Sequence, residues 1–377
     1  MRFSQMLSFY YQKLIPVAVL AGAMFFRMFG VFVALPIAAI FAASLSGGDK
    51  AWAVGLAVGS YGITQAIMQI PTGVLADRWG RKPVLVGALL IFAMGGFVAA
   101  AADTVWLLMI GRLLQGGGAV ASVTAAWIAD VTAPSWRGRA MLGYGAAIAL
   151  AFATSLILAA PLTVWVGLDG IFALAGWLGL VSAAAVLLLP SPPQERCPPA
   201  AVLIINRDVA LYAAGAFVAH YALSSLFLLL PPKLQNLLPL AEHWHLYAPA
   251  FLLSLLFGVP LVWKEKRHTL IGAGFLTAAG LGIALTSEVL LSVGFGLFLF
   301  FAGFVALEAL VPARTSKSVA ANIRGAAMGV VMTAEFAGMF AGAAVSGILI
   351  TIVGAGMAVA MAVLLIFIWA GWCFAVK

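Results

Sequence analysis

The stretch GVLADRWGRKPVL, from Gly73 to Leu85, places a short charged segment between two long apolar runs. It contains one acidic and three basic side chains: Asp77, Arg78, Arg81 and Lys82. Such charges are costly inside the hydrocarbon core of a bilayer, whereas about 20 apolar residues match its thickness. The stretch therefore predicts a charged turn between two membrane-spanning helices, which can approach closely at Gly73 because glycine has no side chain.

The composition indicates that lipid surrounds this chain. Of 377 residues, 64% are apolar and 8% are charged, whereas a soluble domain carries about 25% charged residues. The apolar runs are continuous rather than alternating, which indicates helices and excludes a transmembrane β-barrel. The net charge of +8 lies in short clusters between these runs. Because topology signals have this placement, we expect no nucleic-acid partner. The sequence predicts an all-α membrane protein.

Twelve apolar runs are long enough to cross a bilayer, at roughly 20 residues per helix. The first six lie near residues 14–43, 51–76, 83–102, 104–127, 140–165 and 168–190. The second six lie near residues 208–231, 246–263, 269–287, 289–311, 325–350 and 353–376. We expect both termini in the cytoplasm, because only Lys50 and Lys233 among the basic residues outside the spans then fall on the opposite side.

A proline-rich segment divides the two sets of spans. The prolines of PSPPQERCPPAAVLIINRD, from Pro190 to Asp208, cannot continue a helix, and its charges cannot enter lipid. We expect an N-terminal six-helix bundle over residues 1–190, a cytoplasmic linker over 191–207 and a C-terminal six-helix bundle over 208–377. A faint repeat supports a parallel duplication: RGRAM begins at Arg137 before the fifth span, and RGAAM begins at Arg324 before the eleventh.

The charged turn resembles the signature loop of the major facilitator superfamily of transporters. LMIGRLLQGGGAVAS (108–122) and ADVTAPSWRGRAM (129–141) are similar to the family's fourth helix and to the loop after it. The resemblance implies two pseudo-symmetric bundles of six transmembrane helices. It also implies a conformational latch that faces the N-terminus of the eleventh helix and holds the outward-open state. The latch residues that it implies are Gly73, Asp77, Arg78, Gly80, Arg81, Lys82, Asp130 and Arg137.

Within the superfamily, the chain resembles the YajR-like group of drug/proton antiporters. FFRMFGVFVALPI (25–37), AEHWHLY (241–247) and ALEALVPA (306–313) carry this resemblance beyond the charged turn. It implies export by antiport from the inner membrane of a bacterium. Two departures are visible. The antiporters' Gly-Pro pattern in the fifth helix appears here as Ala160–Pro161, and no soluble domain follows the last span, so we expect no regulation by such a domain.

Arg27, Arg112, Glu335 and His220 are predicted to lie deep within the membrane, where ionisable groups are usually functional, and Glu308 lies at a shallower depth. The candidates for proton coupling are Glu335, His220, Glu308 and Arg112. Glu335 is interpreted as a proton carrier or, equally, as a partner in a static ion pair or helix–helix hydrogen bond, since the YajR-like pattern has glutamine there. His220 titrates in the range needed for proton coupling, with an interhelical hydrogen bond as the alternative. Arg112 cannot carry a proton itself, so a structural or coupling role is favoured for it, with direct substrate contact as the alternative.

The candidates for a substrate cavity are Arg27, Tyr61, Gln65, Gln69 and Gln115. Three roles stay open for the arginines: holding an anion, tuning a carboxylate or donating to backbone carbonyls. Polar contacts between helices would explain Tyr61, Gln65 and Gln69 nearly as well. His243 and His245 lack a third ligand, so no metal site is predicted.

The sequence shows no catalytic constellation and no nucleotide-binding loop. We therefore predict no enzymatic activity and no cofactor, and we expect an ion gradient to drive transport. The predicted function is proton-coupled export of small amphipathic or lipophilic molecules by alternating access. The protein would act as a monomer whose partners are its substrate, protons and the lipid bilayer. The alternatives are a carrier for a specific metabolite, sugar or siderophore, and a non-transporting sensor or assembly protein of the same fold.

Overall fold

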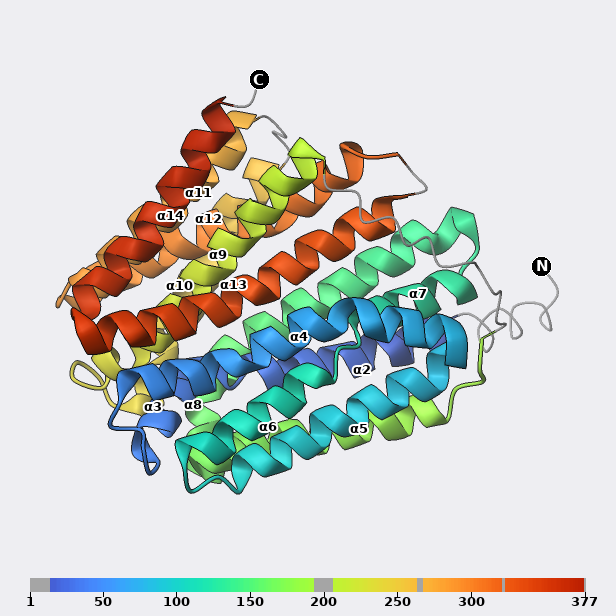
Figure 1. Ribbon diagram of the computed structural model, residues 1–377, viewed down its shortest axis with the longest axis horizontal. Helices are drawn as coiled ribbons and strands as arrows, with labels where there is room; N and C mark the ends of the chain where they lie inside the picture. Colours follow the sequence, from blue (N-terminus) through green and yellow to red (C-terminus); the bar gives the residue numbers. More distant parts are fainter. Residues whose placement is uncertain (1–13, 193–205, 263–266, 321–322, 376–377) are drawn as a thin grey trace.

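The computed structural model describes residues 14–192, 206–262, 267–320 and 323–375. This part of the chain is almost entirely helical (Figure 1). The first set of helices is α2 (Ile15–Phe32), α3 (Leu35–Ser44), α4 (Ala51–Trp79), α5 (Arg81–Ala100), α6 (Val105–Gly117), α7 (Ala121–Val131) and α8 (Pro134–Leu187). The second set is α9 (Arg207–Leu234), the short η2 (Leu240–Glu242), α10 (Trp244–Val262), α11 (Arg267–Thr286), α12 (Leu290–Lys317), α13 (Arg324–Ile352) and α14 (Ala355–Ala375).

Two crossings of the first set are built from pairs of helices. The first crossing consists of α2 and α3, which are separated just before Pro36, where the chain lacks a backbone N–H donor. The fourth crossing consists of α6 and α7, which are separated at residues 118–120. Each pair covers one apolar run of the sequence, so the breaks interrupt predicted spans without adding new ones.

One long helix accounts for two crossings. α8 has 54 residues, or about 80 Å at the α-helical rise, whereas a bilayer core is about 30 Å thick. Gly167 divides it, with a φ of 78° that glycine adopts at little cost. The described residues contain ten stretches that are long and apolar enough to span a membrane, with α8 counted once. With α8 divided and α10 included, the helices give the twelve predicted crossings.

Several helices extend beyond the apolar runs that predicted them. α4 continues to Trp79, α12 to Lys317, and α8 begins at Pro134. Charged residues at these positions continue the helix past the hydrocarbon layer, where water can solvate them. Hydropathy alone therefore ends α4 and α12 too early and starts α8 too late. The predicted linker over 191–207 lies mostly outside the described residues, and the domain boundaries stay a prediction.

The buried apolar side chains form two clusters. One cluster draws almost entirely on α2 to α8, with Leu228 and Ala343 added from the second set of helices. The other draws mainly on α9 to α14 and includes a few residues of the first set, such as Phe152. The clusters meet where α4 packs against α13 and where α8 packs against α10. Two cores therefore share a boundary along these helix pairs.

The contact between α4 and α13 is tightest at one end. A Cβ atom added at Gly59 would lie 2.9 Å from the Phe340 carbonyl oxygen, and one added at Gly62 would lie 2.6 Å from that of Phe336. At the first turn of α4, the backbone N–H of Trp52 donates to Thr351 Oγ1 at 3.1 Å. The two helices separate toward the opposite end, where α4 reaches the charged turn (Figure 1). The structure is therefore closed at the Ala51 end.

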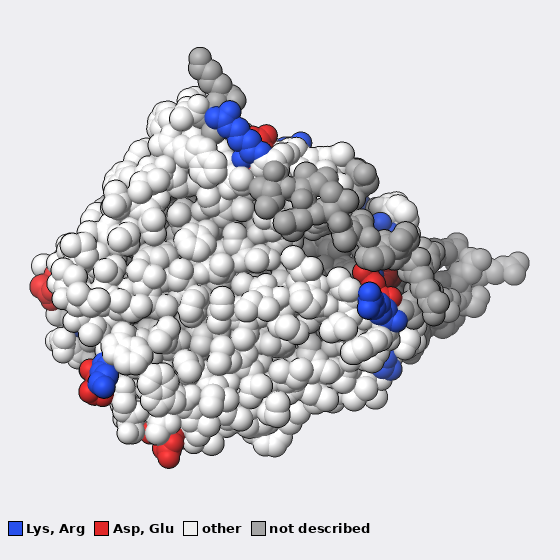
Figure 2. All heavy atoms as spheres, in the orientation of Figure 1, with Lys and Arg blue, Asp and Glu red and all other residues white. Residues whose placement is uncertain are grey.

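The surface has the charge distribution of a membrane protein. Figure 2 shows a broad face with few charges, while acidic and basic side chains gather toward its margins. Large apolar side chains are widely exposed around the bundle, including Trp165, Leu188 and Leu291. Water would not stabilise such exposure over so large an area, whereas lipid chains solvate it.

Candidate functional site

Arg27, on α2, lies fully buried in the first half of the chain. Its Nη2 donates to Gln65 Oε1 on α4 at 2.7 Å and to the carbonyl oxygen of Gly118 at 3.2 Å. Its guanidinium group also lies 5.4 Å from the centre of the Phe92 ring. Both polar contacts join helices that are distant in the sequence, so Arg27 links α2, α4 and the break between α6 and α7.

Arg112, on α6, lies in the same cluster. Its Nη1 donates to Gln115 Oε1 at 2.9 Å. The guanidinium groups of Arg112 and Arg27 both lie over the ring of Tyr61, 5.0 and 5.9 Å from its centre. The cluster thus consists of two cations that share one aromatic ring. The structure brings together all five predicted cavity residues and Arg112, each 3% exposed or less: Arg27, Tyr61, Gln65, Gln69, Gln115 and Arg112.

No carboxylate is paired with either arginine among the described residues. The ion pairs found there involve Arg81, His220 and Lys233 instead. Several buried polar atoms of the cluster also have no hydrogen-bond partner: Arg27 Nε, Arg112 Nε, Gln115 Nε2 and Tyr61 Oη. Because arginine stays protonated in proteins, the cluster holds two positive charges with unused donors.

A second cluster lies in the other half of the chain. His220, on α9, has its Nδ1 3.7 Å from Glu308 Oε1 on α12 and 3.1 Å from the carbonyl oxygen of Ala216. The carboxyl groups of Glu308 and Glu335, on α13, interact electrostatically. The structure therefore groups three of the four proton-coupling candidates on three helices. Arg112 lies apart from them, in the first cluster.

Accessibility differs between the members of this second cluster. The side chain of Glu308 is 41% exposed and that of His220 is 10% exposed. The ring of Phe304, one turn before Glu308, meets the imidazole edge to face at 5.5 Å. No sequence signal pointed to Phe304, because an aromatic residue in an apolar helix is normally a packing residue.

The charged turn between α4 and α5 forms a network with α7. Arg81 Nη1 lies 2.6 Å from Asp77 Oδ1, and Arg81 Nε lies 3.1 Å from Asp130 Oδ2. Lys82 donates to the carbonyl oxygen of Leu189 at 2.7 Å, which joins the turn to the end of α8. Gly80 adopts a φ of 96°, a conformation that a residue with a side chain rarely adopts.

The remaining predicted latch residues lie on α4 and α8. Arg78 is exposed in the last turn of α4, and Arg137 Nη2 lies 3.5 Å from the Thr132 carbonyl oxygen. The close helix approach expected at Gly73 is absent: a Cβ atom there would meet only Ser122 Oγ, at 3.9 Å. The close approach of α4 lies instead at Gly59 and Gly62, because the helices separate toward the charged turn.

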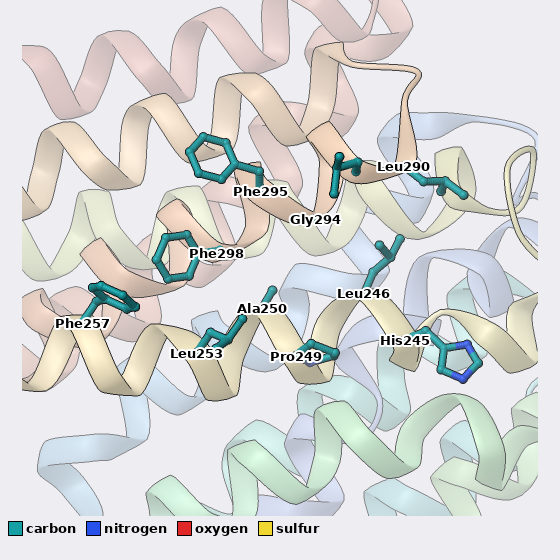
Figure 3. Close-up of a pocket in the computed structure, with 11 residues that line it drawn as sticks. His245, Leu246, Pro249, Ala250, Leu253, Phe257, Leu290, Gly294, Phe295 and Phe298 are labelled. Atoms are coloured by element: carbon teal, nitrogen blue, oxygen red, sulfur yellow. The ribbon is translucent and has the colours of Figure 1, made fainter.

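A hollow of about 540 Å³ opens between α10 and α12 (Figure 3). Apolar side chains line it, among them Leu253, Phe257 and Phe298, and His245 lies at one end. Neither arginine of the first cluster nor the carboxyl groups of the second contribute to its lining. The hollow offers no carboxylate or cationic group to a substrate, so it is not the candidate site.

Two packed six-helix sets with a polar cluster on either side of their boundary define a polytopic membrane transporter. The family model of the Major Facilitator Superfamily matches residues 17–343, and the chain belongs to this family. It is 31% identical over 344 residues to the inner membrane transport protein YajR of Escherichia coli, covering 85% of this chain and 74% of YajR. It is also 31% identical over 256 residues to the multidrug resistance protein MdtH of Yersinia pestis, covering 64% and 62%.

Solved transporters share the fold at low sequence identity. A bacterial homologue of the human lysosomal transporter Spinster, in an inward-facing and occupied conformation, superimposes with a TM-score of 0.77 at 15% identity, over 95% of each chain. The D-xylose-proton symporter superimposes with a TM-score of 0.74 at 14% identity, over 95% of this chain and 96% of the symporter. The relatives are transport proteins rather than enzymes, and this chain is a multi-pass membrane transporter of the same fold.

Proposed function

We propose that this protein exports small amphipathic or lipophilic molecules in exchange for protons, by alternating access to a site between its two halves. The observation that carries the proposal is the cluster of His220, Glu308 and Glu335 on three helices of the second half. Ionisable groups within a membrane are costly, and an interacting set of them takes up and releases protons as a unit.

The exposure of Glu308 supports its role as the entry point for protons. A carboxylate that faced lipid would be destabilised, so we expect its 41% exposed side chain to border water inside the protein. A proton that reaches Glu308 can pass to His220, whose Nδ1 is 3.7 Å away, or can change the charge that Glu335 experiences. Protonation of Glu335 would then remove a negative charge from α13, the helix that packs against α4.

The names of the relatives favour export over uptake. MdtH is named a multidrug resistance protein, and YajR is named an inner membrane transport protein, which agrees with a bacterial inner membrane for this chain. The charged turn would lie in the cytoplasm, so the closed Ala51 end would face outward. The latch residues around Asp77 would then hold the opposite, outward-open conformation.

Proton movement in proteoliposomes tests the proposal. Liposomes that contain a pH-sensitive dye are challenged with lipophilic cations, weak acids and metabolites in turn. We expect at least one amphipathic compound to trigger proton flux, and Glu308→Gln and Glu335→Gln to reduce that flux at least tenfold. Glu288→Gln is the matched control, because Glu288 is 77% exposed and pairs with Lys233 outside both clusters. Flux that survives both Glu308→Gln and Glu335→Gln would refute proton coupling through this cluster.

A further inference from the structure

We propose that Arg27 and Arg112 bind the anionic group of the substrate, and that the substrate is an amphipathic organic anion such as a carboxylate on an aromatic body. The inference rests on the proposed transport function and names the class of molecule that is carried. Its basis is a site in the first half of the chain, separate from the His220–Glu308–Glu335 cluster.

The charge balance of the cluster favours a bound anion. Arg27 is 0% and Arg112 is 2% exposed, and arginine does not lose its proton in a protein. A buried charge is costly unless a partner compensates it. Among the described residues no carboxylate pairs with either guanidinium group, and the ring of Tyr61 supplies only a weak cation–π contact to each. A bound anion would supply the missing negative charge.

The unused donors of the cluster have the chemistry of an anion site. Arg27 Nε, Arg112 Nε and the amide nitrogen of Gln115 are buried without a partner, as is the Tyr61 hydroxyl. Buried donors without a partner are rare in folded proteins and each is destabilising. Guanidinium groups bind carboxylate and phosphate oxygens through paired hydrogen bonds. An oxyanion could therefore satisfy several of these donors at once.

The other two roles that the sequence left open for the arginines find less support. Only one backbone carbonyl, that of Gly118, accepts a hydrogen bond from Arg27, which leaves most of the ten N–H donors of the two guanidinium groups without a backbone acceptor. Neither arginine is paired with Glu308 or Glu335, which lie on α12 and α13 in the other half. A substrate anion explains both the unbalanced charge and the unused donors.

The surroundings of the arginines favour an anion with an apolar body. The Phe92 ring lies 5.4 Å from the Arg27 guanidinium group, and Met28 Sδ lies 3.5 Å from Arg27 Nη1. The ring of Phe336 meets that of Tyr61 edge to face at 6.2 Å. Such a lining solvates an aromatic or aliphatic group but poorly replaces the water of a small inorganic ion.

The helix boundary explains how an anion would reach buried arginines. Tyr61, on α4, covers both guanidinium groups and contacts Phe336 on α13. A movement that separates these two helices would uncover the Tyr61 ring and the arginines beneath it. We therefore expect the substrate to enter in a conformation in which α4 and α13 are farther apart, and to be enclosed when they close.

Binding of matched probes to the full-length protein in lipid nanodiscs tests this inference. The probes are 1-naphthoate, the neutral 1-naphthamide and the cation 1-naphthylmethylammonium, which share a ring system and differ in charge. Titration calorimetry, corrected with empty nanodiscs, should show naphthoate binding at least tenfold more tightly than the other two. Arg27→Gln and Arg112→Gln should each weaken naphthoate binding at least tenfold. Arg139→Gln, the same change at an exposed arginine, should leave it unchanged.

Arg27→Lys keeps the positive charge and should retain more naphthoate binding than Arg27→Gln, which distinguishes loss of charge from loss of folding. Equal binding of the three probes, or full naphthoate binding by both glutamine variants, would overturn the inference. The inference would also be overturned if inorganic phosphate or chloride occupied the site at millimolar concentration and excluded naphthoate, because the site would then serve an inorganic ion.

Naphthoate binding without proton flux would refute proton coupling alone. Proton flux triggered only by the cation would refute the anion site alone.

Discussion

The rings of Tyr61 and Phe336 meet edge to face across the boundary between α4 and α13, with their centres 6.2 Å apart. Tyr61 covers the two buried arginines of the first half. Phe336 follows Glu335, a member of the His220–Glu308–Glu335 cluster of the second half. This aromatic contact thus lies between the cluster of Arg27 and Arg112 and the His220–Glu308–Glu335 cluster. Movement at this boundary would change the surroundings of both clusters together, as the exchange of a proton for an anion would require.

Substitution of Gly59 by valine should prevent closure at the Ala51 end. A Cβ atom there would lie 2.9 Å from the Phe340 carbonyl oxygen, so the larger side chain would force α4 away from α13. We expect transport to fall more than tenfold while the protein still inserts into the membrane. Gly87→Val is the control, because a Cβ atom at Gly87 would meet no atom within 4 Å. Equal transport rates in the two variants would show that the close contact is not needed.

Cross-linking at the same end should trap the conformation of the structure. The backbone N–H of Trp52 contacts Thr351 Oγ1 at 3.1 Å, so cysteines placed at these two positions should react with a short bifunctional linker. The background carries Cys197→Ser and Cys373→Ser, which removes both native thiols. We expect the linked protein to transport at less than a tenth of its unlinked rate, and a reducible linker to allow recovery. Full activity after complete cross-linking would mean that this end does not open.

Asp77→Asn should reduce transport without lowering the stability of the protein. Asp77 is 44% exposed and pairs with Arg81 at 2.6 Å, and exposed ion pairs contribute about 0–1 kcal/mol. The unfolding midpoint should therefore change little, while transport should fall at least tenfold because the latch can no longer hold the outward-open state. The measurements are thermal unfolding and proteoliposome flux, with Asp49→Asn, an exposed carboxyl before α4, as the control. Unaltered flux in Asp77→Asn would remove the latch from the mechanism.

The sequence predicted the crossings of this fold because hydropathy and charge both depend on the local segment. The turn with Asp77 and Arg81 was predictable for the same reason, since its charges, its glycine and its neighbouring spans lie within a few residues. The ends of α4 and α12 were placed too early, because a helix can continue into water without apolar residues. The break between the fifth and sixth spans was predicted at residues 166–167, and Gly167, with its φ of 78°, divides α8 there.

The grouping of the candidate residues depends on packing between distant helices. Burial within the membrane predicted that His220 and Glu308 were unusual, but only the contact of α9 with α12 places them 3.7 Å apart. Arg27 and Arg112 meet at the Tyr61 ring through the packing of α2, α4 and α6, which no spacing in the sequence encodes. The close approach of α4 at Gly59 rather than Gly73 depends on the conformation, and a sequence does not specify which conformation is adopted.

Arg112→Gln should leave the ligand-free protein at least as stable as the wild type. Arg112 contributes one hydrogen bond, to Gln115, while its buried charge has no carboxylate partner. Removing an uncompensated buried charge is typically neutral or stabilising, by about 1 kcal/mol or more. The thermal unfolding midpoint of the ligand-free protein in nanodiscs provides the measurement, with Arg139→Gln as the exposed control. A large loss of stability in Arg112→Gln would indicate that the arginine is compensated by the protein itself.

Stability should fall in mild acid because of His243, which lies after η2 outside the membrane-spanning helices. Burial lowers the pKa of this imidazole, and the carbonyl oxygens of Leu238 and Leu234 offset the effect only in part. The unfolded chain therefore binds the proton more readily than the folded protein. The contribution of the neutral His243 imidazole to stability is present above the unfolded pKa of about 6.5. It is lost as the pH falls toward and through the lowered folded pKa, by at most about 1.4 kcal/mol per pH unit.

Thermal unfolding at pH 7.5 and 5.5 should show a smaller acid-induced decrease in the unfolding midpoint of His243→Gln than in that of the wild type. His245→Gln, at the exposed neighbouring histidine, should keep the wild-type decrease; an identical pH dependence in all three proteins would exclude His243 as its source.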